Sequence, residues 1–211
     1  MQPDDRTPEE TARIRAIYDR MASRYDRKAG DGGRAIGDGR AWLAMQASGK
    51  TLEVGIGTGL TIALYPEDVR LAGIELSPAM LQIAQDRATS AGRMADLRLG
   101  DATDLPFPDA NFDTVTFCLV LCTVPDERRA VAEAVRVLRP GGRMVAFEHV
   151  RSPNRAVRFV ERLVEPFAIR RDGDHLLRDP LDCLAEHDLE VEHLDRRFFG
   201  VMERLIARKP A

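Results

Sequence analysis

A glycine-rich turn between an apolar strand and a helix constrains the fold of this 211-residue chain more than any other feature. The run LEVGIGTGL covers residues 52–60, with glycines at positions 55, 57 and 59. Glycine lets the backbone approach a ligand closely and adopt conformations that a side chain would forbid. Glu75 stands twenty residues after Gly55, at the end of the next expected strand. In doubly wound α/β folds, an acid at this place binds the ribose of a nucleotide-like ligand.

Short apolar runs alternate with helical patterns along most of the chain. Strands are expected at residues 51–54, 70–76, 97–99, 114–119, 143–150, 189–198 and 202–207. Helices are expected near residues 7–25, 41–47, 77–91, 125–138 and 153–168. This alternation predicts βαβ units and a parallel sheet with helices on both faces. Gly30–Gly39 holds five glycines in ten residues, which predicts a bend or a moving hinge.

Two details of the glycine turn favour one ligand over another. A dinucleotide-binding turn has the pattern G-x-G-x-x-G, but here the third glycine, Gly59, comes one position early. Glu53 stands two residues before Gly55, near the place where a pyrophosphate would lie. A carboxylate would repel phosphates there, whereas it suits a ligand that carries an ammonium and a sulfonium. The turn therefore predicts S-adenosylmethionine, with an NAD-type oxidoreductase and a non-catalytic adenosylmethionine-binding module as the alternatives.

Charge and composition exclude several classes of protein. The formal net charge is −3, and charges of both signs are spread along the chain, so we expect no nucleic-acid partner. No run of about 18 apolar residues is present, and the polar N-terminus differs from a secretory signal. Three cysteines, Cys118, Cys122 and Cys183, indicate free thiols in a reducing compartment. We therefore expect a cytoplasmic location and no metal site.

Four motifs, in this order and at their usual separations, resemble the class I S-adenosylmethionine-dependent methyltransferases. They are LEVGIGTGL, GIELSPAMLQIAQDRA, GDATDLPFPDANFD and VLRPGGRM. The resemblance implies a Rossmann-like α/β fold with a seven-stranded, mostly parallel sheet, an antiparallel last strand, helices on both faces and an N-terminal helical lid. It implies a single domain over residues 1–211. Residues 1–49 would form the lid and hinge, 50–150 the cofactor-binding core, and 151–211 the acceptor-side helix, loop and hairpin.

The resemblance also assigns cofactor contacts by position. From the methionine end to the adenine, the expected contacts are Glu53, Gly55, Gly57, Gly59, Glu75, Leu76, Met80, Asp101 and Ala102. Cys118, at the end of the fourth expected strand, would lie beside the transferred methyl group.

The N-terminal run IYDRMASRYD, residues 17–26, resembles the lid of quinone, phospholipid and thiol methyltransferases. In that group the second tyrosine closes over the cofactor, which implies this role for Tyr25. The runs EHV at 148–150 and DGDHL at 172–176 are similar to bacterial phospholipid N-methyltransferases and related thiol methyltransferases. Those relatives often have cysteine where this chain has Asp174. The acceptor is therefore expected to be a small lipid-like, thiol or natural-product molecule.

Little catalytic machinery is required, because a sulfonium already activates the methyl group. The protein must mainly align the nucleophile and exclude water, and a base is needed only where the acceptor loses a proton. His149, at the end of the fifth strand, and His175, in a late loop, are the candidates for that base. The sequence leaves open the acceptor, the atom methylated, the use of a base, the closure of the lid and the oligomeric state.

The late helix has two faces of different chemistry. Its arginine face carries Arg155, Arg158 and Arg162, and its apolar face carries Val157, Val160, Val164 and Phe167. We expect the apolar face to pack on the core and the arginines to face solvent. Peripheral contact with an anionic membrane is the alternative, because a basic amphipathic helix can lie in a lipid surface.

Overall fold

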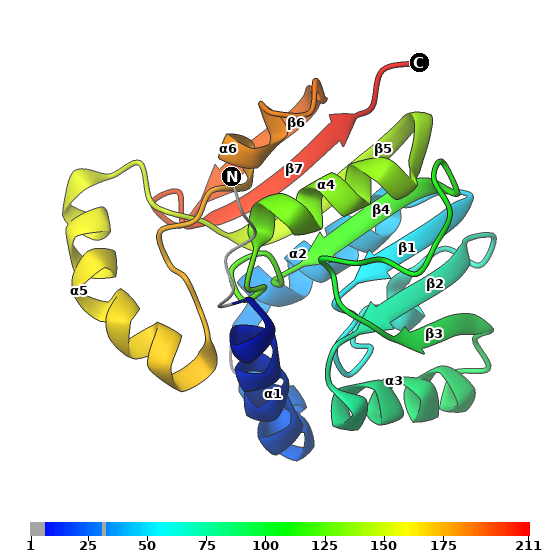
Figure 1. Ribbon diagram of the computed structural model, residues 1–211, viewed down its shortest axis with the longest axis horizontal. Coiled ribbons are helices and arrows are strands. Elements are labelled where there is room, and N and C mark those ends of the chain that lie inside the picture. Colours follow the sequence, from blue (N-terminus) through cyan, green and yellow to red (C-terminus); the bar gives the residue numbers. More distant parts are fainter. Residues whose placement is uncertain (1–6, 31–32) are drawn as a thin grey trace.

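The computed structural model describes residues 7–30 and 33–211, and it is built on one seven-stranded sheet (Figure 1). The strands are β1 (Lys50–Val54), β2 (Arg70–Glu75), β3 (Ala95–Leu99), β4 (Phe112–Cys118), β5 (Leu138–His149), β6 (Glu190–Arg197) and β7 (Met202–Arg208). Their order across the sheet is β3-β2-β1-β4-β5-β7-β6. The pairings from β3 to β5 are parallel, whereas β7 runs antiparallel to both β5 and β6. This arrangement confirms the expected Rossmann-like sheet.

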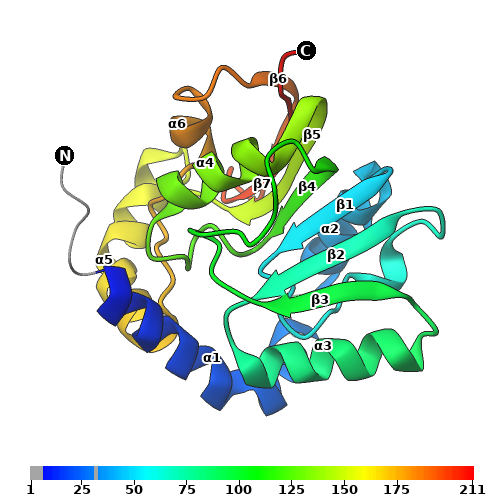
Figure 2. The same cartoon turned by 45° about the vertical axis from the view of Figure 1, so that its right-hand side comes forward.

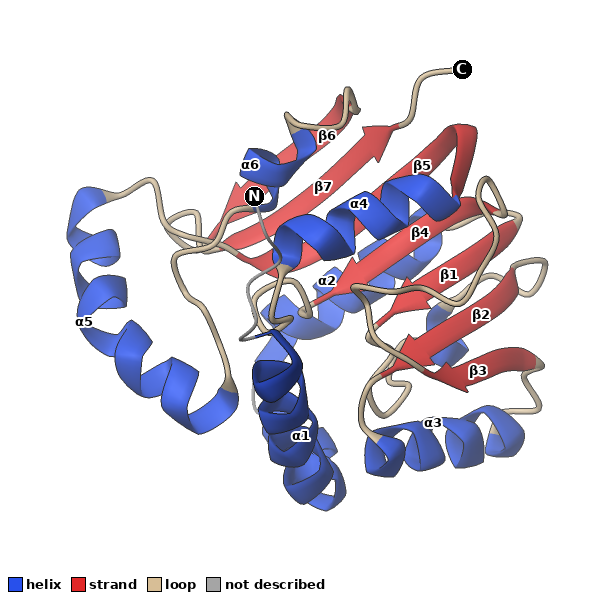
Figure 3. Ribbon diagram, viewed as in Figure 1, coloured by secondary structure: helices blue, strands red, loops and turns tan. Residues whose placement is uncertain are grey.

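Helices cover both faces of the sheet (Figure 3). They are α1 (Thr7–Gly30), α2 (Gly33–Gln46), α3 (Pro78–Ser90), α4 (Glu127–Val137), α5 (Arg155–Asp172) and α6 (Pro180–Leu184), with a 3-10 turn η1 (Ile62–Leu64). One apolar core joins α4 and α6 to the sheet, and a second joins α2, η1 and α3 to the opposite face. Within the described residues, no helix has both the length and the apolar content that crossing a membrane requires.

Alternating side chains of β5 show why both faces need cover. Met144 and Ala146 belong to the core under α4, whereas Val145 and Phe147 belong to the core under α2. Successive strand residues point to opposite faces, so an apolar run of this kind is stable only between two helical layers.

The glycine-rich segment differs from the expected bend. Helix α2 begins at Gly33, so Gly33–Gly39 is helical and the prediction of a bend there was wrong. Asp31 and Gly32, which belong to the same predicted hinge, lie outside the described residues. A Cβ atom on Gly39 would overlap the Phe147 ring. Glycine therefore serves close packing of α2 on β5.

The apolar face of the late helix is also on the opposite side from the one expected. Val160, Val164 and Phe167 of α5 are exposed, whereas Glu161 of the same helix is buried. The expectation that these apolar residues pack on the core was wrong. Glu161 accepts hydrogen bonds from the backbone N–H of Ser152, and this contact turns the acidic side of α5 inward.

Candidate active site

Three cavities that share lining residues lie under α1. Figure 2 shows α1 at the end of the sheet where the parallel strands terminate. The first, which we call the groove, is lined by residues of α1, β2 and the segment after β3. The second, the glycine pocket, is lined by the turn after β1 and by α2. The third, the chamber, is lined by α1, α2, the loop after β4 and the end of α5. Tyr25 lines all three cavities. A ligand that spans the groove and the glycine pocket would therefore meet a second ligand in the chamber at Tyr25.

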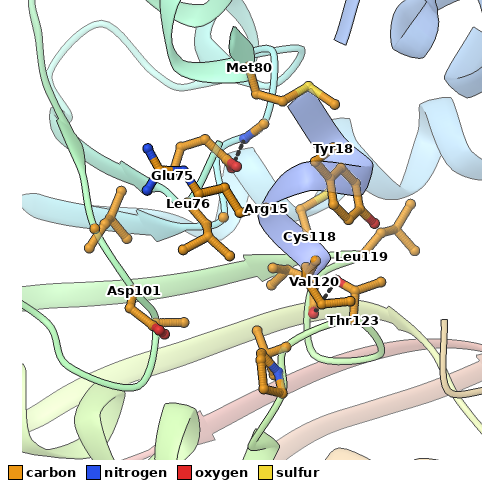
Figure 4. Close-up of a pocket in the computed structure, with 18 of the residues that line it drawn as sticks. Arg15, Tyr18, Glu75, Leu76, Met80, Asp101, Cys118, Leu119, Val120 and Thr123 are labelled. Carbon is orange, nitrogen blue, oxygen red and sulfur yellow. Dashed lines mark hydrogen bonds between the residues drawn. The ribbon is translucent and has the colours of Figure 1, made fainter. Parts of the chain in front are cut away.

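The groove begins at the glycine turn and the acid that ends β2 (Figure 4). One carboxylate oxygen of Glu75 accepts from Gly57 N at 2.9 Å and the other from Ser77 N at 2.8 Å. Gly57 has a φ of 58°, and the space where a Cβ atom would point is open. Burial raises the pKa of Glu75 above its usual value. A ligand can thus approach both the Gly57 backbone and the Glu75 carboxyl group.

The far end of the groove lies after β3, where Asp101 and Ala102 line it together with Leu76 and Met80 (Figure 4). Asp101 Oδ1 accepts from the backbone N and the hydroxyl of Thr103, each at 2.8 Å. These bonds fix the carboxylate at the edge of the cavity. A polar group beside two apolar side chains fits a flat heteroaromatic ring that carries an amino group.

The glycine pocket contains a buried carboxyl group and a cation. The Thr61 hydroxyl donates to both Glu53 oxygens, at 2.8 and 2.6 Å. Burial raises the pKa of Glu53 to about 7, and Arg40 opposes that rise. Arg40 lines the same pocket and was missed by sequence reasoning, because the segment before it was interpreted as a bend rather than as part of α2. Glu53 and Arg40 can receive the ammonium and the carboxylate of an amino acid.

Helix α1 covers the groove and is held there by polar contacts at three positions along its length. Thr11 Oγ1 donates to Asp101 at 3.5 Å, and Ser77 Oγ donates to Asp19 at 2.5 Å. Asp26 accepts from Thr58 Oγ1 at 2.6 Å and pairs with an arginine of α3. Because the two aspartates are seven residues apart, they lie on one side of the helix.

The chamber has a volume of about 330 Å³ and combines aromatic, acidic and basic side chains. Tyr18 and Tyr25 of α1 line it, and burial raises the pKa of both, that of Tyr25 to about 12. His149 Nδ1 and Asp174 Oδ1 are buried without a hydrogen-bond partner among the described residues. Burying an unsatisfied polar atom costs about 1–3 kcal/mol, so each of these atoms is suited to a ligand.

A buried carboxyl group supports the loop after β4. Glu148 Oε1 accepts from Val120 N at 2.9 Å and Leu121 N at 3.2 Å, while Leu119 takes the left-handed region with a φ of 58°. Burial raises the pKa of Glu148 to about 8. Cys118 lies just before this loop, and its thiol pKa is raised by burial, so it is an uncharged wall of the site.

The two histidines that the sequence suggested as bases are placed differently. His149 lines the chamber. His175 is not among the described residues that line these three cavities, and its backbone N donates to Cys122 O at 2.8 Å. Burial lowers the pKa of His175 to about 4, so this side chain is neutral near pH 7. Asp174, its neighbour in sequence, contributes to the chamber instead.

The sheet order, the turn after β1 and the acids near the ends of three successive strands define an α/β domain that binds a nucleoside joined to an amino acid. Residues 52–146 match the family model described as "Methyltransferase domain". This segment of the chain is similar to a methyltransferase domain, and S-adenosylmethionine is the cofactor that the groove and the glycine pocket would hold. The groove and the glycine pocket fit this cofactor, because the glycine pocket holds a buried carboxyl group beside an arginine, which suits the two charged ends of an amino acid.

Among curated proteins, the chain is 38% identical over 121 residues to a phosphatidylethanolamine N-methyltransferase of Cereibacter sphaeroides, covering 56% of this chain and 60% of that one. It is 35% identical over 139 residues to a demethylmenaquinone methyltransferase of Tropheryma whipplei, covering 65% of this chain and 57% of that one. The chain thus spans about 60% of these relatives' length. A solved putative methyltransferase of Bacillus halodurans shares the fold, with a TM-score of 0.70 at 19% identity, covering 85% of this chain and 100% of that one.

Proposed function

We propose that this protein transfers a methyl group from S-adenosylmethionine to the amine nitrogen of a small, lipid-like acceptor held in the chamber. The observation that carries this proposal is the buried Oδ1 of Asp174, for which the described residues supply no N–H or O–H donor; the neighbouring group of this carboxyl is the Cys122 thiol. A positively charged amine would satisfy that carboxylate oxygen, and the rings of Tyr18 and Tyr25 offer π faces that attract a cation. Phosphatidylethanolamine, named for one relative, carries such an amine.

When bound, S-adenosylmethionine supplies a methyl group on a positively charged sulfur, which leaves with the electrons of the carbon–sulfur bond. The chain's own residues hold the reactants in line. Glu53 and Arg40 would orient the amino-acid end of the cofactor, and Glu75 and Asp101 would hold its ribose and its adenine. Tyr25, which lines all three cavities, would lie between the two reactants and help to exclude water from them.

An ammonium group has no free electron pair, so the acceptor must lose one proton before its nitrogen can attack. His149 is placed for this task, because its Nδ1 is buried, without a partner among the described residues, and belongs to a side chain that lines the chamber. An imidazole near neutral pH can take the proton and return it to water. Asp174 holds the remaining N–H groups while this happens.

The Asp174 carboxylate disfavours an acceptor that reacts as an anion. A thiol or a phenol reacts fastest after losing its proton, and a nearby carboxylate such as Asp174 raises the pKa of that group. Arg171, which lines the chamber, already pairs with Asp172. Arg40 also lines the chamber, but it lines the glycine pocket as well, beside Glu53. Asp174 is therefore the charge that supports an amine over a thiolate or a quinol.

The test is release of S-adenosylhomocysteine with short-chain phosphatidylethanolamine in solution, compared with its N-acetylated form, an alkane thiol and a naphthoquinol. We expect turnover of the free amine alone. Asp174→Asn should lower kcat/KM for the amine by about tenfold or more, while the affinity for S-adenosylhomocysteine stays unchanged. Turnover of the thiol or the quinol without the amine, or an Asp174→Asn variant with full activity, would reject the proposal. No turnover of any acceptor, with intact cofactor binding, would favour a non-catalytic binding module.

Substitution tests the role of His149 separately. His149→Gln keeps a polar side chain that cannot take up the proton, so it should lower kcat with the amine by about 100-fold while the affinity for S-adenosylhomocysteine stays unchanged. A His149→Gln variant with full turnover would assign the proton transfer to water or to another group.

A further inference from the structure

Helix α5 presents to the protein the side that amphipathic helices usually turn outward. Glu161 accepts from Ser152 N at 3.0 Å, and Glu165 accepts from Leu177 N at 3.0 Å, so both acids face the chain. The opposite side exposes Phe159 to 62% and Leu163 to 66%, and three further apolar side chains are exposed beside them: Val160, Val164 and Phe167. A helix that covers only its own protein would bury these residues. Such a patch marks a surface that another apolar phase covers.

A second apolar feature adjoins the start of α5. Phe198 and Phe199 form the turn between β6 and β7 and are 56% and 77% exposed. Both have positive φ, at 54° and 59°, a conformation that costs a residue with a side chain about 1–2 kcal/mol. Ser152 Oγ donates to Phe199 O at 2.5 Å, which fastens the turn to the segment that leads into α5. Two exposed aromatic rings are thus held next to the segment that leads into the helix.

The charges around this surface identify what covers it. Exposed arginines flank the apolar side chains of α5, namely Arg155, Arg162, Arg170 and Arg171. Among the described residues, no acidic side chain forms an ion pair with Arg155, Arg162 or Arg170. We propose that α5 and the Phe198–Phe199 turn dock on an anionic phospholipid bilayer, with the aromatic and aliphatic side chains in the interface and the arginines on the lipid phosphates. A second copy of the chain fits less well, because symmetric pairing would bring these arginines together.

Position along the helix connects this surface to the chamber. Arg171 in the last turn of α5 and Asp174 just beyond it both line the chamber, so the docking helix ends at the cavity wall. Figures 1 and 2 show α5 beyond the end of the sheet, beside α1. Docking would bring the chamber close to the head groups of the bilayer. This last step rests on the proposed function, whereas the docking surface itself does not.

Flotation with vesicles tests the surface without any turnover. The probes are vesicles of phosphatidylcholine alone and of phosphatidylcholine with an equal part of phosphatidylglycerol. The docking variant is Phe159→Asp with Leu163→Asp, and the matched control is Met94→Asp, since Met94 is 91% exposed in the segment before β3. We expect the wild type and Met94→Asp to float with the anionic vesicles and the double variant to bind at least about tenfold less. About 0.5 M NaCl should weaken wild-type binding, because salt screens the arginine–phosphate attraction.

Several outcomes overturn the proposal. Wild-type protein that ignores anionic vesicles would reject it, and so would a double variant that binds as well as Met94→Asp does. A wild-type dimer in sedimentation equilibrium that Phe159→Asp with Leu163→Asp makes monomeric would assign the face to self-association instead. Turnover of short-chain phosphatidylethanolamine, which needs no bilayer, is measured in parallel. Loss of vesicle binding with normal turnover, or the reverse, therefore separates failure of this proposal from failure of the proposed function.

Discussion

Helices α1 and α5 lie side by side at the end of the sheet, and they bury opposite kinds of face (Figure 2). Ile14 and Ile17 of α1 are buried, and its two tyrosines line the cavities. Helix α5 buries Glu161 and exposes Phe159. The two helices touch through a hydrogen bond from the Arg13 side chain to Ile169 O. The same 3.6-residue periodicity thus produces a lid in one case and an outward-facing surface in the other.

The positions of polar partners explain this difference. In α1, Asp19 and Asp26 accept hydrogen bonds from hydroxyl groups around the groove, so these aspartates and the tyrosines lie on the same side of the helix. In α5, Glu161 and Glu165 accept from backbone N–H groups of the segments that precede and follow the helix. Hydrophobic periodicity gives the width of an apolar stripe, but the partners of the charged residues decide which way the stripe points.

Truncating one apolar side chain in each helix should show the largest difference. Ile17→Ala in α1 removes a buried side chain and should cost about 2–4 kcal/mol of the free energy of unfolding. Leu163→Ala in α5 removes an exposed one and should change it by less than about 0.5 kcal/mol. Denaturation in urea measures both. Equal losses would mean that α5 packs on the protein in solution, and the contrast between the helices would disappear.

Binding beneath α1 should respond to pH, whereas binding at α5 should respond to salt. The pKa of Glu53 is raised by burial to about 7, so lowering the pH below 7 protonates the group that we propose to receive the cofactor's ammonium. Affinity for S-adenosylhomocysteine should then fall by up to about tenfold per pH unit, with release of a proton on binding near neutral pH. The arginines of α5 keep their charge throughout, so vesicle binding should not follow pH.

Glu53→Gln is the matched control for this titration. Calorimetry between about pH 5.5 and pH 8 should show that the variant binds S-adenosylhomocysteine more weakly than the wild type does, and that its affinity depends less on pH. The stability of the ligand-free protein should depend on pH in the opposite direction from the cofactor affinity. A carboxyl group whose pKa rises on folding favours the folded state at low pH, so the Glu53 contribution to stability is complete below its usual pKa of 4.5 and is lost as pH rises through 7. Parallel pH curves for both proteins would assign the titration elsewhere.

The groove could be predicted from the sequence because its parts are local. Gly57 and Glu75 belong to one strand–turn–helix–strand unit, and parallel strands carry their terminal residues to one edge. Arg40 and Asp174 depend on longer-range packing. Arg40 reaches the glycine pocket because α2 packs on β5, and Asp174 reaches the chamber because α5 turns its acidic side inward. Which face of α5 packs on the protein could not be predicted, since it depends on the hydrogen bond from Ser152 N to Glu161, and a hydrophobic pattern carries no information about such a bond.

The anchors of α1 should have a smaller effect than its buried core. Asp19 accepts from Ser77 Oγ and, at 3.3 Å, from Ala79 N, which ties the lid to the start of α3. Asp19→Ala should weaken S-adenosylhomocysteine binding by about five- to tenfold, while Asp19→Asn should recover most of the loss. Asp86→Ala, on the exposed side of α3, is the neutral control. Equal affinities in all three variants would show that the lid does not depend on this contact.

Substitution in the strained Phe198–Phe199 turn should give the smallest effect. It should raise the free energy of unfolding and weaken vesicle binding. Glycine tolerates the φ of 59° at Phe199 without the cost that a side chain incurs. Phe199→Gly should therefore raise the free energy of unfolding by about 0.5–1 kcal/mol, even though glycine gains entropy in the unfolded chain. The same change removes an exposed ring and should weaken binding to anionic vesicles. Val191→Gly, at an exposed position of the extended strand β6, should instead lower stability. A Phe199→Gly variant that loses stability would mean that the exposed ring serves the fold, and the turn would then belong with α1 rather than with the docking surface.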